Sequence, residues 1–214
     1  MASDKKQSRG RGRPRQENAP DPDHVARLAL NAFAAFGFEG ASVRAIAAAA
    51  NVDSALVLRR YGSKSGLWNA TVDRLGERMS VLWTAVDNLR VDPAPLPDRC
   101  RRVIRLFVAF CCEVPELGRF FTDEIAKPSE RRDYLLERIW RPHVRVLRPF
   151  LQEARNAGVL MVDDVELLVF LLVGMVAMPL MMGPIITSDL GIEWQDLESR
   201  MSRSIERMVL LPTD

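Results

Sequence analysis

The amino-acid sequence predicts an all-α protein in which a small N-terminal module of three helices precedes a larger helical body. Apolar residues recur at spacings of three and four along most of the chain, and no segment shows the strict alternation typical of a half-buried strand. The chain has 214 residues, 48% of them hydrophobic. This is enough apolar material for a substantial core and enough length for a small domain joined to a larger one.

Charge is distributed unevenly along the chain. Residues 1–64 hold 11 of the 30 lysines and arginines but only 6 of the 28 aspartates and glutamates, so this segment is strongly basic although the whole chain carries only +2. The remainder is mildly acidic. A basic head on such a body predicts that the head meets a polyanion.

Residues 1–20 have no apolar periodicity and are expected to form a flexible basic arm. The arm contains RGRGRPR, whose Gly-Arg-Pro element resembles the core of an AT-hook. Arginine side chains favour the narrow minor groove of A·T-rich DNA, so Arg11, Arg13 and Arg15 are expected DNA contacts. The alternative is a generic basic tail that adds salt-sensitive affinity without sequence preference.

The first helix is expected to begin after Asp21, a good N-cap residue, with Pro22 at its first position. Gly37 is expected to end it, because glycine accepts the left-handed conformation common at helix ends. Apolar residues at helical spacing form its expected buried face: Val25, Leu28, Ala29, Ala32, Phe33 and Phe36.

Two short helices should follow. Ser42 is expected to cap the first of them, and Asn51 then suits a tight turn because asparagine tolerates positive φ better than most residues. Asp53 is expected to cap a third helix over SALVLRRY, residues 54–61. Two short helices joined by such a turn form a helix-turn-helix.

A helix-turn-helix presents the first residues of its second helix to base edges in the major groove. Ser54 and Ala55 occupy that position, and Arg44 on the preceding helix is expected to contact guanine bidentately. Lys64 begins the next helix, where its charge and free backbone N–H groups should converge on one phosphate. The residues expected to lie where phosphates flank the groove are Arg59, Arg60, Tyr61 and Lys64.

The segment ALNAFAAFGFEGASVRAIAAAANVDSALVLRRYGSKSGL resembles the N-terminal domain of the TetR family of bacterial transcriptional regulators. FAAFGFEG, SVRAIA, a Val-led third helix and YGSKSGL occur in the family's order, over about residues 24–70. The chain departs from the family pattern at four positions: Asn51 for glycine in the turn, Asp53 for serine, Leu58 for the aromatic residue that commonly touches DNA, and Ser65 for glutamate or lysine.

The resemblance implies a helix-turn-helix DNA-binding domain over residues 21–66, with Ser42 and Leu58 added to its expected DNA contacts. It implies a helical regulatory and dimerisation domain over residues 67–214. In this family, occupation of a cavity in the second domain moves the two DNA-reading heads of a dimer apart. We therefore expect a homodimeric repressor that binds double-stranded DNA at a palindromic operator and is released by a small apolar effector.

The body is expected to start with a long helix from Ser63 or Lys64 to the prolines of residues 90–98. Its expected buried residues are Leu67, Leu75, Met79, Leu82, Trp83 and Val86. Pro142 and Pro149 should kink or divide a later helix, and a last amphipathic helix should run from Glu193 to about Leu210.

Two further sets of functional residues are expected in the body, one lining a ligand cavity and one forming a dimer interface. The expected cavity-lining residues are Phe107, Phe110, Cys111, Phe121, Trp140, His143 and Met175. The expected dimer contacts are Leu168, Leu172, Met175, Trp194, Leu197, Met201 and Ile205. The alternative for each cavity residue is ordinary core packing.

Three other classes of protein are alternatives to a transcriptional regulator. Leu167–Ile186 is about long enough to cross a membrane, but Pro179 and Pro184 interrupt it and no aromatic belt flanks it, so we expect a core or interface helix. Neither histidine belongs to a nucleophile–base set, so no enzymatic activity, cofactor or metal site is expected. A non-specific architectural DNA-binding protein using the arm alone is the remaining alternative.

The cysteines indicate in which cellular compartment the protein is expected to work. Cys100, Cys111 and Cys112 have neither metal-ligand nor redox spacing, and the N-terminus shows no secretory signal. These observations favour buried thiols in a cytoplasmic protein.

Overall fold

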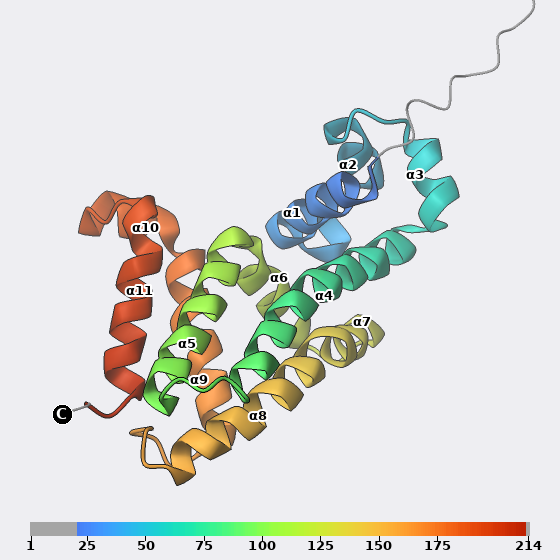
Figure 1. The fold of residues 1–214 in the computed structure, drawn as a ribbon. Coiled ribbons are helices and arrows are strands. Elements are labelled where there is room, and N and C mark those ends of the chain that lie inside the picture. The colour runs from blue at the N-terminus through green and yellow to red at the C-terminus, as the bar shows by residue number, and fades with distance from the viewer. Residues whose placement is uncertain (1–20, 213–214) are drawn as a thin grey trace, which may run out of the picture.

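The computed structural model describes residues 21–212, and its regular elements over that range are all helical (Figure 1). The expectations for Arg11, Arg13 and Arg15 therefore lie outside the described residues. A single isolated antiparallel bridge joins Leu160 to Leu210. The all-α prediction is confirmed. The helices are α1 (Pro22–Gly40), α2 (Val43–Ala49), α3 (Ser54–Tyr61), α4 (Lys64–Leu89), α5 (Leu96–Glu113), α6 (Glu116–Ile125), α7 (Glu130–Leu135), α8 (Arg141–Asn156), α9 (Val165–Met181), α10 (Gly183–Leu190) and α11 (Trp194–Val209).

The helix starts in the N-terminal module follow from side-chain caps that the sequence predicts. Asp21, Ser42 and Asp53 each accept a hydrogen bond from a backbone N–H in the first turn of the helix that follows. Ser63 does the same for α4 through Gly66. Each cap pairs one of the donors that a helix start otherwise leaves free.

The end of α1 differs from the expectation. Gly37 has positive φ, at 67°, as predicted, but helical structure resumes beyond it to Gly40. Phe36 was predicted to lie on the buried face, which is wrong, because its side chain is 69% exposed. The backbone bend at Gly37 instead brings Phe38 onto Phe33, with ring centroids 5.9 Å apart.

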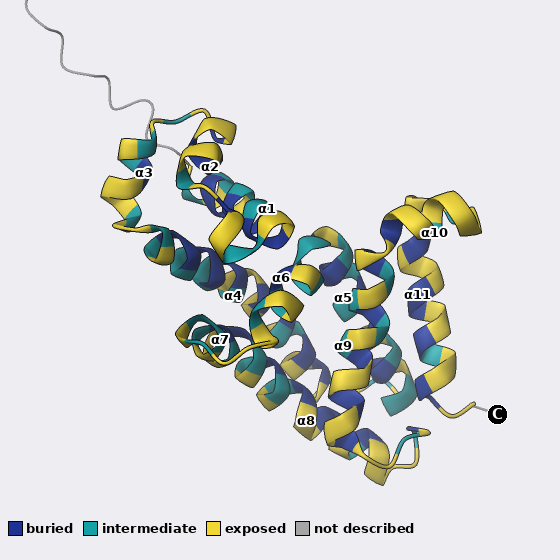
Figure 2. Ribbon diagram, turned by 180° about the vertical axis from the view of Figure 1, so that it is seen from behind, coloured by how far each residue is buried: buried dark blue, intermediate teal, exposed yellow. Residues whose placement is uncertain are grey.

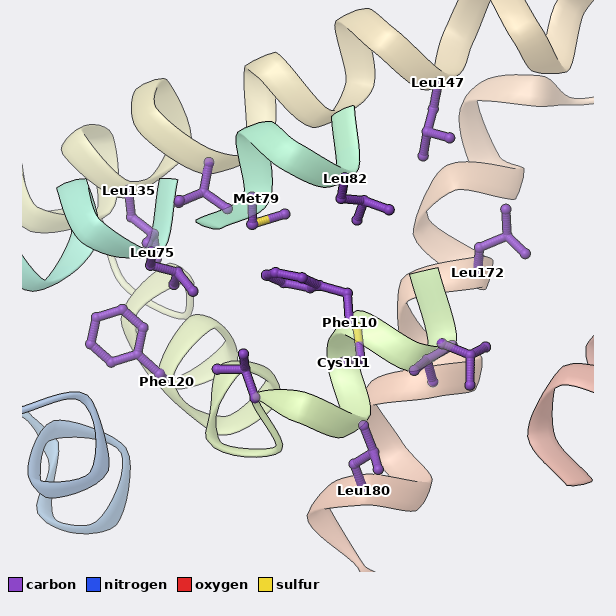
Figure 3. Close-up of a cluster of buried hydrophobic side chains, with 14 of the residues drawn as sticks. Leu75, Met79, Leu82, Phe110, Cys111, Phe120, Leu135, Leu147, Leu172 and Leu180 are labelled. Atoms are coloured by element: carbon purple, nitrogen blue, oxygen red, sulfur yellow. The ribbon is translucent and has the colours of Figure 1, made fainter. Parts of the chain in front are cut away.

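Helix α4 joins the N-terminal module to the body, and the predicted domain boundary near residue 66 falls within its first turn. Figure 1 shows α1, α2 and α3 gathered at one end of α4, while α5, α8, α9 and α11 gather at the other end. All the predicted buried residues of α4 are buried except Trp83, which is half-buried. Figure 3 shows side chains from α4 through α9 meeting in the body's core, with Leu75 and Met79 of α4 near Phe110 of α5.

The two prolines of the α8 region behave differently. Pro142 stands at the start of α8, directly after a π-helical turn over Leu136–Trp140. Since proline has no N–H to donate to the preceding turn, the wider turn before it accommodates this loss. Pro149 lies inside α8 without ending it.

The long apolar segment forms two helices. Helices α9 and α10 meet at Met182 with a bend of 66°. Within residues 21–212, no single helix is long and apolar enough to cross a membrane, and only this bent pair reaches that length and composition together.

Candidate DNA-binding surface and interior cavities

Helices α2 and α3 form a tight helix-turn-helix. Asn51 has φ of 55°, as predicted, and the N–H of Val52 donates to the carbonyl of Ala47 at 3.0 Å. Val57 is 1% exposed and fixes α3 to the core, where Ile46 and Ala47 of α2 are also buried. The small alanine side chains of α2 let α3 pack closely against it. With Val57 fixed in the core, the opposite side of α3 faces solvent.

Most predicted DNA contacts lie on the surface of this module. Figure 2 shows α3 largely exposed apart from its buried anchor. Ser54 and Tyr61 are half-buried, and the exposed members of the set are Ser42, Arg44, Ala55, Leu58, Arg59 and Arg60. Asp53 accepts a hydrogen bond from the N–H of Ala55 at 2.8 Å. The acidic side chain therefore serves the helix start and is held back from the rest of α3.

Lys64 does not extend toward a phosphate as expected. Its ammonium donates to the carbonyl oxygen of Glu39 at 3.0 Å and lies 4.7 Å from the centre of the Phe38 ring. The residue is half-buried. Its charge thus ties the start of α4 to the end of α1, and the expectation of a free phosphate contact is corrected.

Phe38 also links the module to the body, a contact that sequence periodicity did not predict. The guanidinium of Arg131, at the start of α7, lies 3.9 Å from the centre of the Phe38 ring. Arg131 in turn donates to Glu124 of α6 at 3.0 Å. A cation on an aromatic face is worth about 0.5–2 kcal/mol, so Lys64, Phe38 and Arg131 together stabilise the junction between α1, α4, α6 and α7.

The body contains two small apolar cavities. The larger, about 60 Å³, lies among α4, α5, α6, the α8 region and α9. Of the predicted ligand-binding residues, those that line it are Phe107, Cys111, Phe121, Trp140 and His143. The smaller cavity, about 30 Å³, is lined by residues that include Phe107, His143 and Phe150.

Two predicted cavity residues are placed elsewhere. Phe110 is buried, but Figure 3 shows it pointing toward Met79 of α4, where it belongs to the core. Met175 lines neither cavity, because α9 reaches them through Leu172, Val173, Val176, Ala177 and Leu180. Both assignments are corrected.

His143 is the most unusual residue of the cavity walls. It is 4% exposed, and its Nδ1 accepts a hydrogen bond from the indole N–H of Trp83 at 3.4 Å. The rings of Phe107 and Trp140 lie 5.3 and 6.3 Å from it, centroid to centroid. Burial lowers the pKa of His143 to about 4, so the imidazole is neutral at pH 7.

The cysteine thiols are equally uncharged. Burial raises the pKa of Cys100 to about 11 and that of Cys111 to about 12. Both side chains therefore behave as small apolar groups at neutral pH. Within residues 21–212, no group of three or more histidine, cysteine or acidic residues is placed to hold a metal ion.

Most of the predicted dimer contacts lie inside a single chain. Leu168, Leu172, Leu197, Met201 and Ile205 are all buried without a partner. The apolar face of α11 packs against α5 and α9 of its own chain, so this face is not available to a second subunit. These five assignments are therefore wrong; Trp194 remains partly exposed.

Comparisons with known proteins agree with this architecture. Residues 27–71 match the family model described as bacterial regulatory proteins, tetR family. No curated protein matches the chain. Among solved structures, a putative fatty acid metabolism regulator from Clostridium perfringens aligns with a TM-score of 0.69 at 16% identity, covering 88% of this chain and all of that one.

Two further structures align over most of their length. A bacterial regulatory protein of the tetR family from Rhodococcus gives a TM-score of 0.68 at 18% identity, covering 90% of this chain and 98% of that one. HlyIIR, a hemolysin II transcriptional regulator, gives 0.64 at 22% identity, covering 86% and 95%. The chain therefore carries an N-terminal domain of the tetR regulatory family over residues 27–71 and shares its overall fold with these solved structures. Its exposed helix-turn-helix is that of a DNA-binding regulator.

The buried histidine makes stability depend on pH. An unfolded histidine takes up a proton near 6.5, whereas His143 does so only near 4 when folded. The unfolded state binds more protons between these values, so stability falls as the pH is lowered through them. From pH 7 to pH 5, the wild type should lose about 2 kcal/mol more unfolding free energy than His143→Leu. Urea unfolding at both pH values measures the difference, and equal losses would contradict a neutral buried imidazole.

Proposed function

We propose that the protein is a homodimeric repressor that binds a palindromic operator and releases it when a small apolar molecule enters the body. The observation that carries this proposal is the double role of α6. Its residues Leu117, Gly118, Phe121 and Thr122 line the larger cavity. The same helix packs along α1 of the DNA-binding module.

Sequence reading is assigned to the exposed outer surface of α2 and α3. Arg44 reads a guanine, while Ser54, Ala55 and Leu58 meet base edges or a thymine methyl group. Arg59 and Arg60 contact phosphates, with Tyr61 beside Arg60, whose guanidinium lies 5.7 Å from the tyrosine ring centre. The backbone N–H groups at the start of α4 add a phosphate contact without the side chain of Lys64.

Dimerisation is assigned to α9 and α10. An apolar stripe at helical spacing runs along the exposed side of α9, formed by Leu167, Phe170, Leu171, Gly174, Met178 and Met181. Met182, Ile185 and Leu190 continue it onto α10. An exposed apolar surface of this extent is typical of a protein interface. Figure 1 shows these helices at the far end of the molecule from α3, which keeps the DNA-binding face clear.

Two-fold symmetry gives the dimer two identical reading helices, which must match half-sites about one DNA turn apart. A molecule larger than the present cavity has to displace its walls, α6 among them, since protein interiors are close-packed. Displacement of α6 moves α1, and with it α2 and α3. The two heads then no longer match the half-site spacing, which lowers operator affinity. The role as repressor follows the family's usual mode of action.

Selection of bound duplexes from a random DNA pool, at near-physiological salt, tests the DNA-binding part. We expect enrichment of one palindromic sequence. Salt-sensitive binding without enrichment would favour a non-specific architectural protein, the alternative function, in which basic residues grip DNA without reading it.

Arg44 and Arg59 should behave differently on the selected duplex. Arg44→Ala should cost about 1–3 kcal/mol on that duplex and little on duplexes altered at the contacted base pair. Arg59→Ala should weaken binding to every duplex and reduce the salt slope by about one counterion. Fluorescence anisotropy over a salt series measures both, with Arg155→Ala on α8 as the control. A uniform loss for Arg44→Ala would exclude its reading role.

The interface assignment predicts the effect of a charge on the α9 stripe. Leu171 is 46% exposed, so Leu171→Glu should leave the fold intact while placing two carboxylates in the dimer contact. We expect a monomer by analytical ultracentrifugation and a loss of operator affinity of at least about tenfold. Val81→Glu, on an α4 side chain that is 72% exposed, is the matched control and should remain dimeric. A dimeric Leu171→Glu variant would place the interface elsewhere.

A further inference from the structure

The two cavities of the body are neighbours divided by a pair of aromatic rings. Phe107 and His143 are the residues common to both linings. Their ring centroids lie 5.3 Å apart. At about 60 and 30 Å³ the separate cavities hold little more than water, far less than the several hundred Å³ typical of ligand pockets. A shift of this divider would join them into one elongated space through the body.

The combined walls carry no charge. Neither lining includes a lysine, arginine, aspartate or glutamate. Thr122, at the edge of the larger cavity, already donates its hydroxyl to the carbonyl of Gly118 at 2.9 Å. An ionised group buried here would find no counter-charge, which costs several kcal/mol.

The side chain of His143 offers one hydrogen-bond donor to this space. The indole N–H of Trp83 can only donate, so Nδ1 of His143 must be the unprotonated, accepting nitrogen. The proton of the neutral ring is then on Nε2, and the hydrogen bond from Trp83 to Nδ1 is the one that this ring makes among residues 21–212. A donor without a protein partner is available to a ligand that supplies an acceptor.

We propose that the joined cavities bind an elongated, uncharged, apolar molecule with one hydrogen-bond acceptor, such as an ester or ketone, whose oxygen accepts from Nε2 of His143. This inference rests on the proposed ligand-released function and specifies the chemical class of the ligand. The apolar walls supply the affinity and the imidazole supplies the orientation. Carboxylates of the same length are excluded, because the walls hold no cation.

Three probes of equal chain length separate these contributions: methyl decanoate, decanoate and decane. Binding to the purified full-length dimer is followed at pH 7 by tryptophan fluorescence, since Trp83 and Trp140 adjoin His143. The ester should bind most tightly, and decanoate at least about tenfold more weakly because its charge is buried unpaired. Decanoate binding as tightly as the ester would overturn the proposal.

His143→Leu tests the donor directly. The variant should bind the ester about tenfold more weakly and decane as well as the wild type does. His143→Asn retains an N–H donor and should keep part of the preference for the ester. Thermal melting checks that both variants are folded. Equal weakening of ester and decane by His143→Leu would show a purely structural role and overturn the assignment.

Phe107→Ala tests whether the divider joins the cavities. Removing the ring should strengthen binding of methyl tetradecanoate relative to methyl decanoate, since the longer chain needs both spaces. An unchanged ratio of affinities would contradict the elongated site.

The effect of methyl decanoate on DNA is measured separately with the selected duplex. Ester binding without DNA release would support the ligand assignment and contradict the ligand-released repressor. Failure of all three probes to bind would overturn the present inference, while the DNA-binding part of the proposed function would stand on its own measurement.

Discussion

The packing of α6 between α1 and α9 is the constraint on which the account of this regulator depends. On one side, α6 lies along α1 and holds Phe120 against Trp68 of α4, with ring centroids 5.7 Å apart. On the other, a side chain added at Gly118 would meet the Cβ of Ala177 at 3.1 Å. The helix therefore has little free space in either direction. A molecule that enlarges the cavity on the side of α6 moves this helix relative to one of these neighbours.

In the proposed mechanism, the junction at Phe38 carries such a movement to the helix-turn-helix. Lys64 and Arg131 both place their cations on the Phe38 ring, and Arg131 is paired with Glu124 of α6. Contacts of this kind are individually modest. Because they join α1 to α6 and α7 at the end of α1 nearest α2, they favour movement of the module as a unit.

The sequence predicted the elements whose cause is local. The N-caps Asp21, Ser42 and Asp53, the positive φ of Asn51 and the start of α4 after Ser63 depend on residues within one turn of the chain. The sequence also placed Phe107, Trp140 and His143 among the cavity residues, since aromatic and histidine side chains on apolar helix faces point inward.

The sequence-based predictions that failed concern which part of the protein packs against a given side of a helix. Helix α9 is apolar on nearly all sides, so helical spacing could not indicate that Leu168 and Leu172 face the core while Leu167 and Leu171 face outward. Lys64 was expected to contact a phosphate because it begins a helix with free backbone N–H groups, but the bend at Gly37 brings Phe38 beneath it. Both outcomes depend on contacts between residues that are remote in sequence or separated by a bend.

The central claim is that the position of α6 controls operator affinity, and substitution at Gly118 tests it most directly. Gly118→Ala adds only the methyl group that meets Ala177 at 3.1 Å, whereas Gly118→Leu adds three further carbons beside Ala177 and Met181 and drives α6 from α9. The affinity of each folded, dimeric variant for the selected duplex is measured without any ligand. We expect slight weakening for Gly118→Ala and at least about tenfold weakening for Gly118→Leu. Wild-type affinity in a folded, dimeric Gly118→Leu protein would contradict the claim.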